Sequence, residues 1–493
     1  MNAWSIKRYS RPRLAVDKVA IVKTGVVLER NGEKFDLDVT GAAPDRRIIA
    51  ATLDRLCTPG ADLWKEVTTE PLHPWAHVLE QLDALGLIQD DERDLPRLRQ
   101  QEADTIASDA RTAAQWLAAS DAPAAPLQRQ ARWLRREAVA QLNGGQTRHI
   151  DTPDFYRDVL TRILRNWSRN APISLAAAAL CLDTYLNHSG AAAGSDALSS
   201  SALDQIRSLS GGLFEPRDIR VHLQTLCVLL LLCGTPAAQR RSRLPVSPKS
   251  VRSGINLMLE GERLATQSLC EMGFSAFQNN LNQRTIPWKL AAAIYIEQYH
   301  LSARFIEIIT PLLHQRLRPR LKNLLYQYYQ EEAGHELFEK EAALSLGVPV
   351  AQIDVSFPTP LFAAYLDVLT GFATENPVGL LLSVLVTEGF PGTHTPINEA
   401  LQAAGLAPSS EAVRKHEQVN LDLHHSTIPR LLMAEIPTVS PAIQKEALTG
   451  LQTMVELNFR AWEMLLAYYS TDDLPFPHTW MSIPPQRVSS IFS

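Results

Sequence analysis

The stretch Tyr328-Tyr-Gln-Glu-Glu-Ala-Gly-His-Glu-Leu-Phe-Glu-Lys-Glu341 decides how the C-terminal half of this sequence is interpreted. On an α-helix, residues three apart lie on one face, so Glu332 and His335 can direct both side chains at one point. Aromatic residues interleave with the acids, which argues against a purely solvent-facing helix. Gly334 lowers helix propensity unless the chain needs a close approach there. Glu331 is the alternative to Glu332 through its i,i+4 spacing, and Glu332 is preferred.

A second carboxylate-x-x-His pair occurs further along the chain, at Asp422 and His425. Two single glutamates, Glu297 and Glu388, occur in mostly apolar stretches, where an unpaired carboxylate is costly to bury. Two such pairs and two single acids, each on its own helix, are the arrangement of a two-metal site in a helical bundle. Four carboxylates offset the charge of two divalent ions, and two neutral imidazoles complete the shell. The sequence therefore predicts a dinuclear metal site.

Alternatives stay open at several of these positions. Arg304 is the alternative to a metal as the charge partner of Glu297. His300 has three possible roles: a metal ligand, a residue that positions a ligand, or a surface residue. On the last helix two faces compete, and the one with Asp422 is preferred because it keeps the carboxylate that bridging needs. The preferred face holds Gln418, Asp422 and His425, and the competing face holds His416, Asn420 and His424.

Composition excludes several classes of protein. The chain has 493 residues, enough for two to four domains, and its 45% of apolar residues can fill sizeable cores. A net charge of −5 gives no basic field, so nucleic acid is not an expected partner. The five cysteines lack C-x-x-C spacing, which is typical of a reducing cytosol. The N-terminus has no apolar signal region, and the longest apolar run, Cys227 to Cys233, is too short to span a bilayer. We expect a cytoplasmic protein without a membrane partner.

Residues 1–95 predict a small α+β domain of winged-helix type. Two β-branched or alternating runs flank Asn31-Gly32, which is a strong hairpin signal. Helices are expected from Asp45 to Leu56 and from Pro74 to a glycine cap at Gly86. The arrangement resembles the peptide-recruiting domains of ribosomal natural-product pathways, which would imply a peptide substrate. A packing or dimerisation role is the alternative. DNA binding is disfavoured by 13 Lys/Arg against 16 Asp/Glu in this segment.

The rest of the chain is predicted to be mainly helical. Residues 96–245 are Ala- and Leu-rich and indicate a helical scaffold or dimerisation region, so a homodimer is expected. A Pro/Ser/Arg-rich linker, 240–252, separates them from residues 253–470, which carry the metal motifs. Residues 471–493, with four prolines, predict an extended tail.

The motifs occur in the order Glu, Glu-x-x-His, Glu, Asp-x-x-His-Ser, and the segment GHELFEKEAALSLGV trails the second of the predicted metal-binding helices. This order resembles that of the haem-oxygenase-like dimetal oxidases and oxygenases. The resemblance covers about residues 285–470. It implies a haem-oxygenase-like helical bundle, two Fe(II) ions with manganese as the alternative, O2 as co-substrate and an external reductant. Many family members have a histidine where this chain has Gln418, which leaves the second iron one nitrogen short and keeps His416 as a substitute. The implied ligands are Glu297, Glu332, His335, Glu388, Asp422 and His425.

The resemblance also implies a reaction class. Such enzymes oxidise amino-acid-, peptide- or amine-type substrates, often in natural-product biosynthesis, by N-oxygenation, oxidative decarboxylation or C–C cleavage. No catalytic residue beyond the metal ligands is indicated, and Arg304 and Arg430 are the candidates to meet a substrate carboxylate. A ferritin-like dimetal protein and a metal-free helical binding protein are the alternatives.

Overall fold

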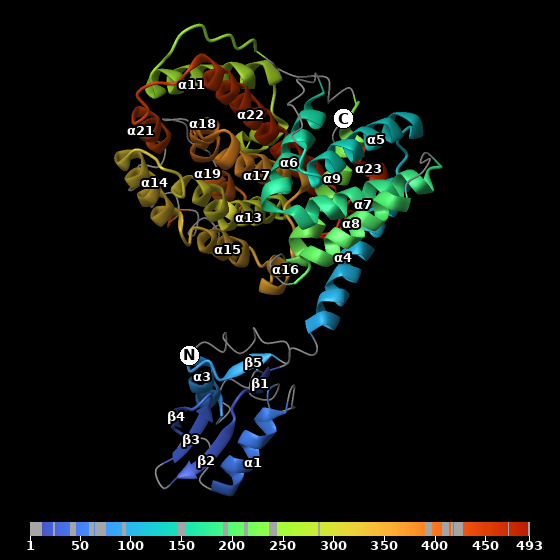
Figure 1. The fold of residues 1–493 in the computed structure, drawn as a ribbon. Coiled ribbons are helices and arrows are strands. Elements are labelled where there is room, and N and C mark those ends of the chain that lie inside the picture. Colours follow the sequence, from blue (N-terminus) through green and yellow to red (C-terminus); the bar gives the residue numbers. More distant parts are fainter. Residues whose placement is uncertain are drawn as a thin grey trace. The chain divides into compact units, whose positions relative to one another are not determined.

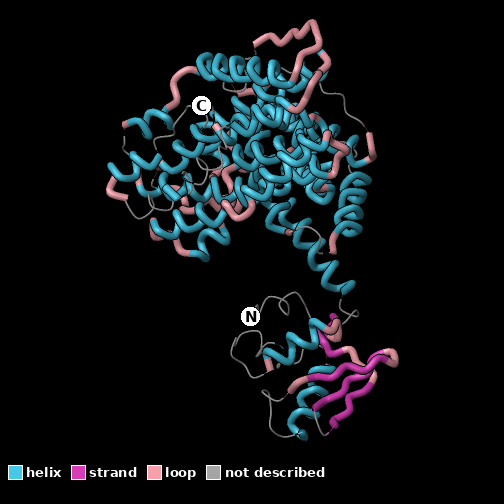
Figure 2. Tube along the Cα trace, turned by 90° about the vertical axis from the view of Figure 1, so that its left-hand side faces the viewer, coloured by secondary structure: helices cyan, strands magenta, loops and turns pink. Residues whose placement is uncertain are grey.

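The computed structural model describes residues 12–22, 25–39, 46–58, 64, 75–90, 95–145, 154–190, 196–211, 215–235, 244–283, 286–389, 397–406, 414–415, 418, 427–471 and 473–491. The chain divides into two compact units, Met1–Glu102 and Ala103–Ser493. All named strands of the described residues lie in the first unit (Figure 2). The predicted mainly α class with a small N-terminal strand region is therefore confirmed.

The first unit combines short strands with helices (Figure 1). Strands β2, β3 and β4 form an antiparallel sheet in that order, and β1 pairs with β5. Leu28 on β3, Leu53 on α1 and Leu79 on α3 are fully buried together in the core of this unit. The elements are β1 Pro12–Leu14, β2 Lys18–Val22, β3 Gly25–Arg30, β4 Glu33–Leu37, α1 Arg46–Cys57, α3 Ala76–Ala84 and β5 Ile88–Asp90.

Two turns of this unit follow the sequence signals. Asn31 and Gly32 have φ of 54° and 83° and connect β3 to β4, as a hairpin turn with two left-handed residues requires. Gly86, with φ of 66°, follows α3, and the next N–H, that of Leu87, bonds the Leu82 carbonyl at 2.9 Å. The predicted hairpin and the predicted glycine cap are confirmed. The winged-helix type and the peptide-binding role stay predictions.

The second unit is built from helices. Several of them begin with a proline in the first turn, where the missing N–H is harmless and the fixed φ suits a helix. The helices are α4 Leu95–Ala118, which starts before the unit boundary, α5 Ala124–Leu142, α6 Phe155–Asn170, α7 Pro172–His188, α8 Asp196–Leu209, α9 Pro216–Leu232, α11 Gly254–Met272, α12 Ala276–Asn282, α13 Trp288–Leu313, α14 Pro319–Glu332, α15 Glu336–Ser345, α16 Val350–Val355, α17 Pro360–Glu375, α18 Pro377–Glu388, α19 Ile397–Ala403, α21 Ile428–Ala434, α22 Pro441–Tyr469 and α23 Pro485–Ile491.

Helix α17 lies at the centre of this unit. Its residues from Pro360 to Ala373 are all buried, as expected for a helix with apolar residues on every face, and Asp367 is the one acid among them. It packs against α6 and α9 from the predicted middle region and against α13, α18 and α22 from the predicted metal-binding region (Figure 1). The sequence boundary at residue 245 is therefore not a boundary between compact units.

The C-terminal tail differs from its prediction in part. Residues 473–484 are irregular, but Pro485–Ile491 form the short helix α23. Leu474, Ile483 and Val488 are buried, and the Trp116 indole donates to the Ile483 carbonyl at 2.8 Å. The tail is packed because its apolar residues contribute to the core of the second unit.

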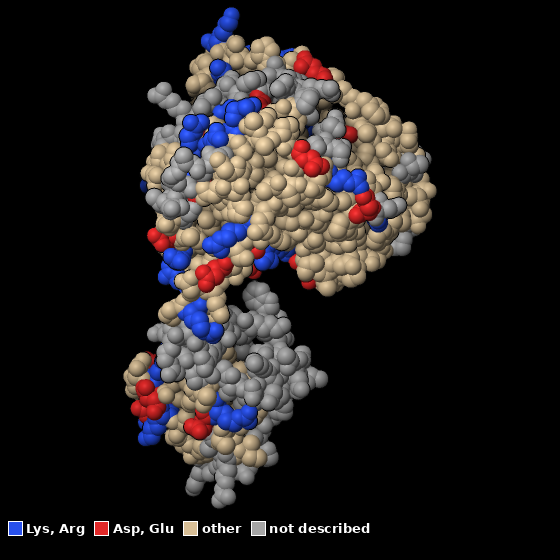
Figure 3. All heavy atoms as spheres, turned by 90° about the vertical axis from the view of Figure 1, so that its right-hand side faces the viewer, with Lys and Arg blue, Asp and Glu red and all other residues tan. Residues whose placement is uncertain are grey.

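No described helix is long and apolar enough to cross a membrane. On the face shown in Figure 3, charged residues of both signs are scattered over a mostly neutral surface.

Candidate functional site

Glu297 lies in the middle of α13 and is only 2% exposed. Its Oε1 accepts a hydrogen bond from the Thr359 N–H at 2.8 Å, just before the start of α17. Its Oε2 has no hydrogen-bond partner among the described residues. Burial raises the pKa of this carboxyl to about 8, although the Thr359 bond lowers it in part. The group is therefore mostly protonated at neutral pH unless a cation approaches it.

The predicted alternative partner of Glu297 is occupied elsewhere. The Arg304 guanidinium bonds Asp367 at 3.1 Å and Glu307 at 3.1 Å. Arg430 makes a bidentate ion pair with Glu262 at 2.6 and 2.8 Å. Both arginines considered for a substrate carboxylate thus have partners within the chain.

Glu332 and His335 are in contact, but the expected reason is wrong. The sequence predicts one helix through both residues, whereas α14 ends at Glu332 and α15 begins at Glu336. Gly334 has φ of 96°, so the helix is interrupted. Nothing lies within 4 Å of a Cβ built on Gly334, so the glycine serves the break and not a close approach. Across this break, His335 Nδ1 lies 3.1 Å from Glu332 Oε2.

Burial distinguishes Glu332 from Glu331. Glu332 and His335 are both buried. Glu331 is only half-buried and accepts a hydrogen bond from the Gln327 amide at 2.7 Å. The geometry thus favours Glu332 as the acid that faces the interior.

Glu388 is the last residue of α18 and is half-buried. The hydroxyl of Tyr328, which lies one turn before Glu332 on α14, donates a short hydrogen bond to Glu388 Oε1. Burial raises the pKa of Tyr328, and the charges of Glu388 and Glu332 raise it further. Tyr328 therefore links α14, the helix that carries Glu332, to Glu388 on α18.

Tyr328 and Glu339 are residues that the sequence analysis did not single out. Glu339 is 3% exposed and follows His335 by four residues on α15. The i,i+4 spacing from His335 is the signal that points to Glu339. Tyr328 has the same spacing to Glu332, but its bond to Glu388 on α18 leaves no local signal in the sequence.

His300 is buried, so it is not a surface residue. Its Nε2 lies 3.0 Å from the Ser356 hydroxyl. Burial lowers its pKa to about 3, and the charges of Arg217, His478 and Arg304 act in the same direction. His300 is therefore a neutral imidazole at physiological pH.

Asp422 and His425 lie outside the described residues, as do His416, Asn420 and His424. Gln418 is described and exposed. Among the residues that the structure does describe, no three His, Cys, Asp or Glu side chains form a group able to hold a metal ion. The structure thus brings together Glu332 with His335, and Tyr328 with Glu388, but it does not display a complete centre.

Among known proteins, no family model and no curated protein matches the sequence. A crystal structure of a domain of unknown function with a heme oxygenase-like fold, from Shewanella denitrificans OS217, is similar to part of the chain. The identity is 20%, the TM-score is 0.38, and the match covers 43% of this chain and 93% of that one.

Proposed function

We propose that this protein is a non-haem diiron oxidase or oxygenase with a haem-oxygenase-like bundle in its second unit. The contact between buried Glu332 and His335 is the observation that carries the proposal. Two donors bound to one ion at about 2.1 Å each, at roughly a right angle, lie about 3 Å apart. The 3.1 Å between His335 Nδ1 and Glu332 Oε2 fits that spacing.

The other proposed ligands supply the remaining donors. They are Glu297 from α13, Glu388 from α18, and Asp422 and His425 from the segment outside the described residues. Oε2 of Glu297 has no hydrogen-bond partner among the described residues and can bind a cation. A bound cation would stabilise the ionised form of this buried carboxyl group. When bound, two Fe(II) ions, or manganese as the alternative, would supply electrons for O2 activation, with an external reductant restoring them.

The chain's own residues would position these donors. The Thr359 N–H holds one oxygen of Glu297 and leaves the other available. The Tyr328 hydroxyl holds Oε1 of Glu388. Aligned donors of this kind fix the orientation of metal-binding carboxylates, as outer-shell partners generally do.

Metal loading tests this proposal directly. Purified with ferrous iron under argon, the protein is expected to bind close to two irons per chain, the second more weakly. Glu332→Ala and His335→Ala should each lower the iron content severely, because each removes a side chain proposed to bind the metal directly. Iron and manganese are measured by elemental analysis of desalted protein.

Glu331→Ala is the matched control, since Glu331 is adjacent in sequence and only half-buried. It should bind iron as the unmodified protein does. Unchanged iron content in both Glu332→Ala and His335→Ala would reject the metal centre and favour the metal-free binding protein.

The proposed substrate is amino-acid-, peptide- or amine-like, and the proposed setting is natural-product biosynthesis in the cytoplasm by a homodimer. A peptide is favoured by one feature of the first unit. Strand β4 is an edge of the described sheet, and the Gln81 side chain of α3 bonds both the N–H and the carbonyl of Asp38, at 3.2 Å each. An edge strand has backbone N–H and C=O groups that can pair with an extended peptide, which would then bind as an added strand of the sheet.

Removal of residues 1–95 tests the peptide role. Iron loading should be retained, because the proposed ligands all lie in the second unit, and turnover of a peptide or carrier-bound substrate should be lost. Assays of iron content and O2 consumption on the same preparation separate the two effects. Full turnover by the truncated protein would show that the first unit is only structural and that a small free metabolite is the substrate.

A further inference from the structure

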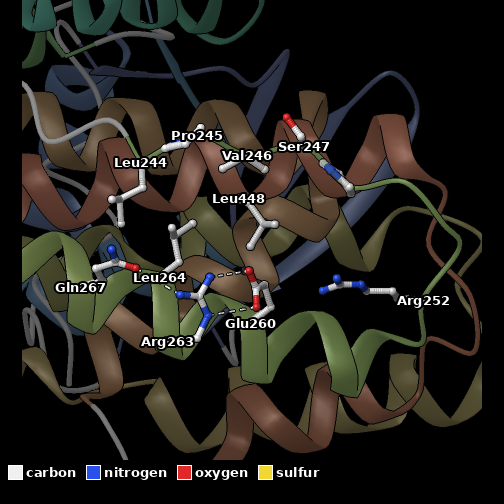
Figure 4. Close-up of a pocket in the computed structure, with 11 residues that line it drawn as sticks. Leu244, Pro245, Val246, Ser247, Arg252, Glu260, Arg263, Leu264, Gln267 and Leu448 are labelled. Atoms are coloured by element: carbon white, nitrogen blue, oxygen red, sulfur yellow. Dashed lines mark hydrogen bonds and ion pairs between the residues drawn. The ribbon is translucent and has the colours of Figure 1, made fainter.

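A pocket of about 380 Å³ lies between α11, α22 and the residues 244–252 (Figure 4). None of its lining residues is a proposed metal ligand. Its size falls at the small end of the range of ligand pockets, about 300–1,000 Å³. The pocket contains both apolar side chains and arginines, which is the combination that recognises an organic anion.

Residues 244–252 are fixed at both ends by glutamines of one helix. The Gln452 amide of α22 accepts from the Leu244 N–H at 3.0 Å and donates to its carbonyl at 3.1 Å. At the other end, the buried Gln444 amide donates to the Ser250 carbonyl at 2.8 Å. Arg252 and Val439 exchange two backbone hydrogen bonds. The sequence predicted only a linker here, but these contacts and two prolines make this wall of the pocket preformed.

The opposite wall is one face of α11. Glu260 and Arg263 form a bidentate ion pair at 2.7 and 3.2 Å, and Arg263 also donates to the Gln267 amide at 3.1 Å. Leu264 on this helix and Leu448 on α22 are buried at the floor of the pocket, and the half-buried Val246 and Pro248 add accessible apolar surface. The floor and the polar rim therefore face the same space.

The charges that line the pocket favour an anionic ligand. Two arginines and one glutamate line the pocket, which leaves one positive charge in excess. Glu260 is ion-paired with Arg263, and the charge of Arg252 also acts on Glu260 from a longer distance, without an ion pair of Arg252 within the described part of the chain. Arg252 is half-buried, and Figure 4 shows its guanidinium directed toward Glu260 across the pocket. In the sequence, Arg240–Arg252 contains five basic residues and no acid.

We propose that this pocket binds a small organic anion that carries one carboxylate on an apolar body. The carboxylate pairs with Arg252, and the apolar body lies against Val246 and Pro248 above the leucine floor. This site is independent of the proposed metal centre and needs no iron.

Decanoate and decan-1-ol are matched probes, because they share a chain and differ in the charged group. Isothermal titration of the full-length protein at low ionic strength, below the micelle concentration, is expected to show decanoate binding at least about tenfold tighter than decan-1-ol. Arg252→Gln should weaken decanoate about tenfold and leave decan-1-ol unchanged. Arg207→Gln is the control, since Arg207 is an exposed arginine of α8 that is paired with Asp204.

A second variant tests the location. Ser247 is exposed and lines the pocket, so Ser247→Trp should fill it without disturbing the core and should abolish binding of both probes. The proposal is overturned by absent decanoate binding, by equal affinities for the two probes, or by undiminished decanoate affinity in Arg252→Gln or Ser247→Trp.

Discussion

Glu297 places a carboxyl group inside the second unit with a hydrogen bond to only one of its oxygens. Such a group is tolerated because burial shifts it toward its neutral form, with a pKa of about 8 against 4.5 when unperturbed. The folded chain therefore holds one more proton than the unfolded chain between these two pH values. Since stability falls with rising pH wherever the folded state binds more protons, Glu297 makes the protein less stable as pH rises through this window.

Replacement by the neutral isostere tests this linkage. Between about pH 5 and pH 8, the unfolding free energy of the metal-free protein should fall by about 1.4 kcal/mol per pH unit more than that of Glu297→Gln. Urea unfolding of both proteins, with chelator present, measures the two slopes. Equal slopes would mean that Glu297 is ionised in the folded protein.

Predictions for individual helices and turns succeeded where the backbone preferences of neighbouring residues determine the structure. The Asn31-Gly32 hairpin could be predicted because both residues tolerate the left-handed backbone that the turn requires. The helix through Glu332 and His335 was wrong because Gly334 adopts φ of 96° and ends it. The contact between these two side chains was nevertheless expected, since a tight turn also brings residues three apart together. Tyr328 could not be found this way, because its partner Glu388 belongs to another helix.

In the second unit as a whole, the sequence predicted separate middle and C-terminal regions, but the two pack into one compact unit. A buried polar cluster connects helices from both regions. Asp367 of α17 accepts from the Trp167 indole at 3.0 Å and from Arg304 at 3.1 Å, and it lies 3.5 Å from His222. Burial raises the pKa of Asp367, but His222, Arg304 and Trp167 outweigh burial and lower it to about 2. Trp167 and Asp367 are 200 positions apart, so no sequence pattern links them.

Removal of this central acid should weaken the whole second unit. Asp367→Ala is expected to destabilise it by about 3–5 kcal/mol, because Arg304 and His222 lose a buried partner. Glu307→Ala removes the exposed partner of the same arginine and should have little effect. Thermal unfolding followed by circular dichroism compares the two variants. Similar losses in both would show that Asp367 does not hold the helices together.

The protonation of Glu297 has a consequence for metal affinity under the proposed function. Its carboxyl group holds a proton below about pH 8 because it is buried. A cation that binds this group must displace the proton, since metal-binding carboxylates are ionised. Iron uptake would therefore release a proton at neutral pH, and its affinity would rise with pH up to about 8.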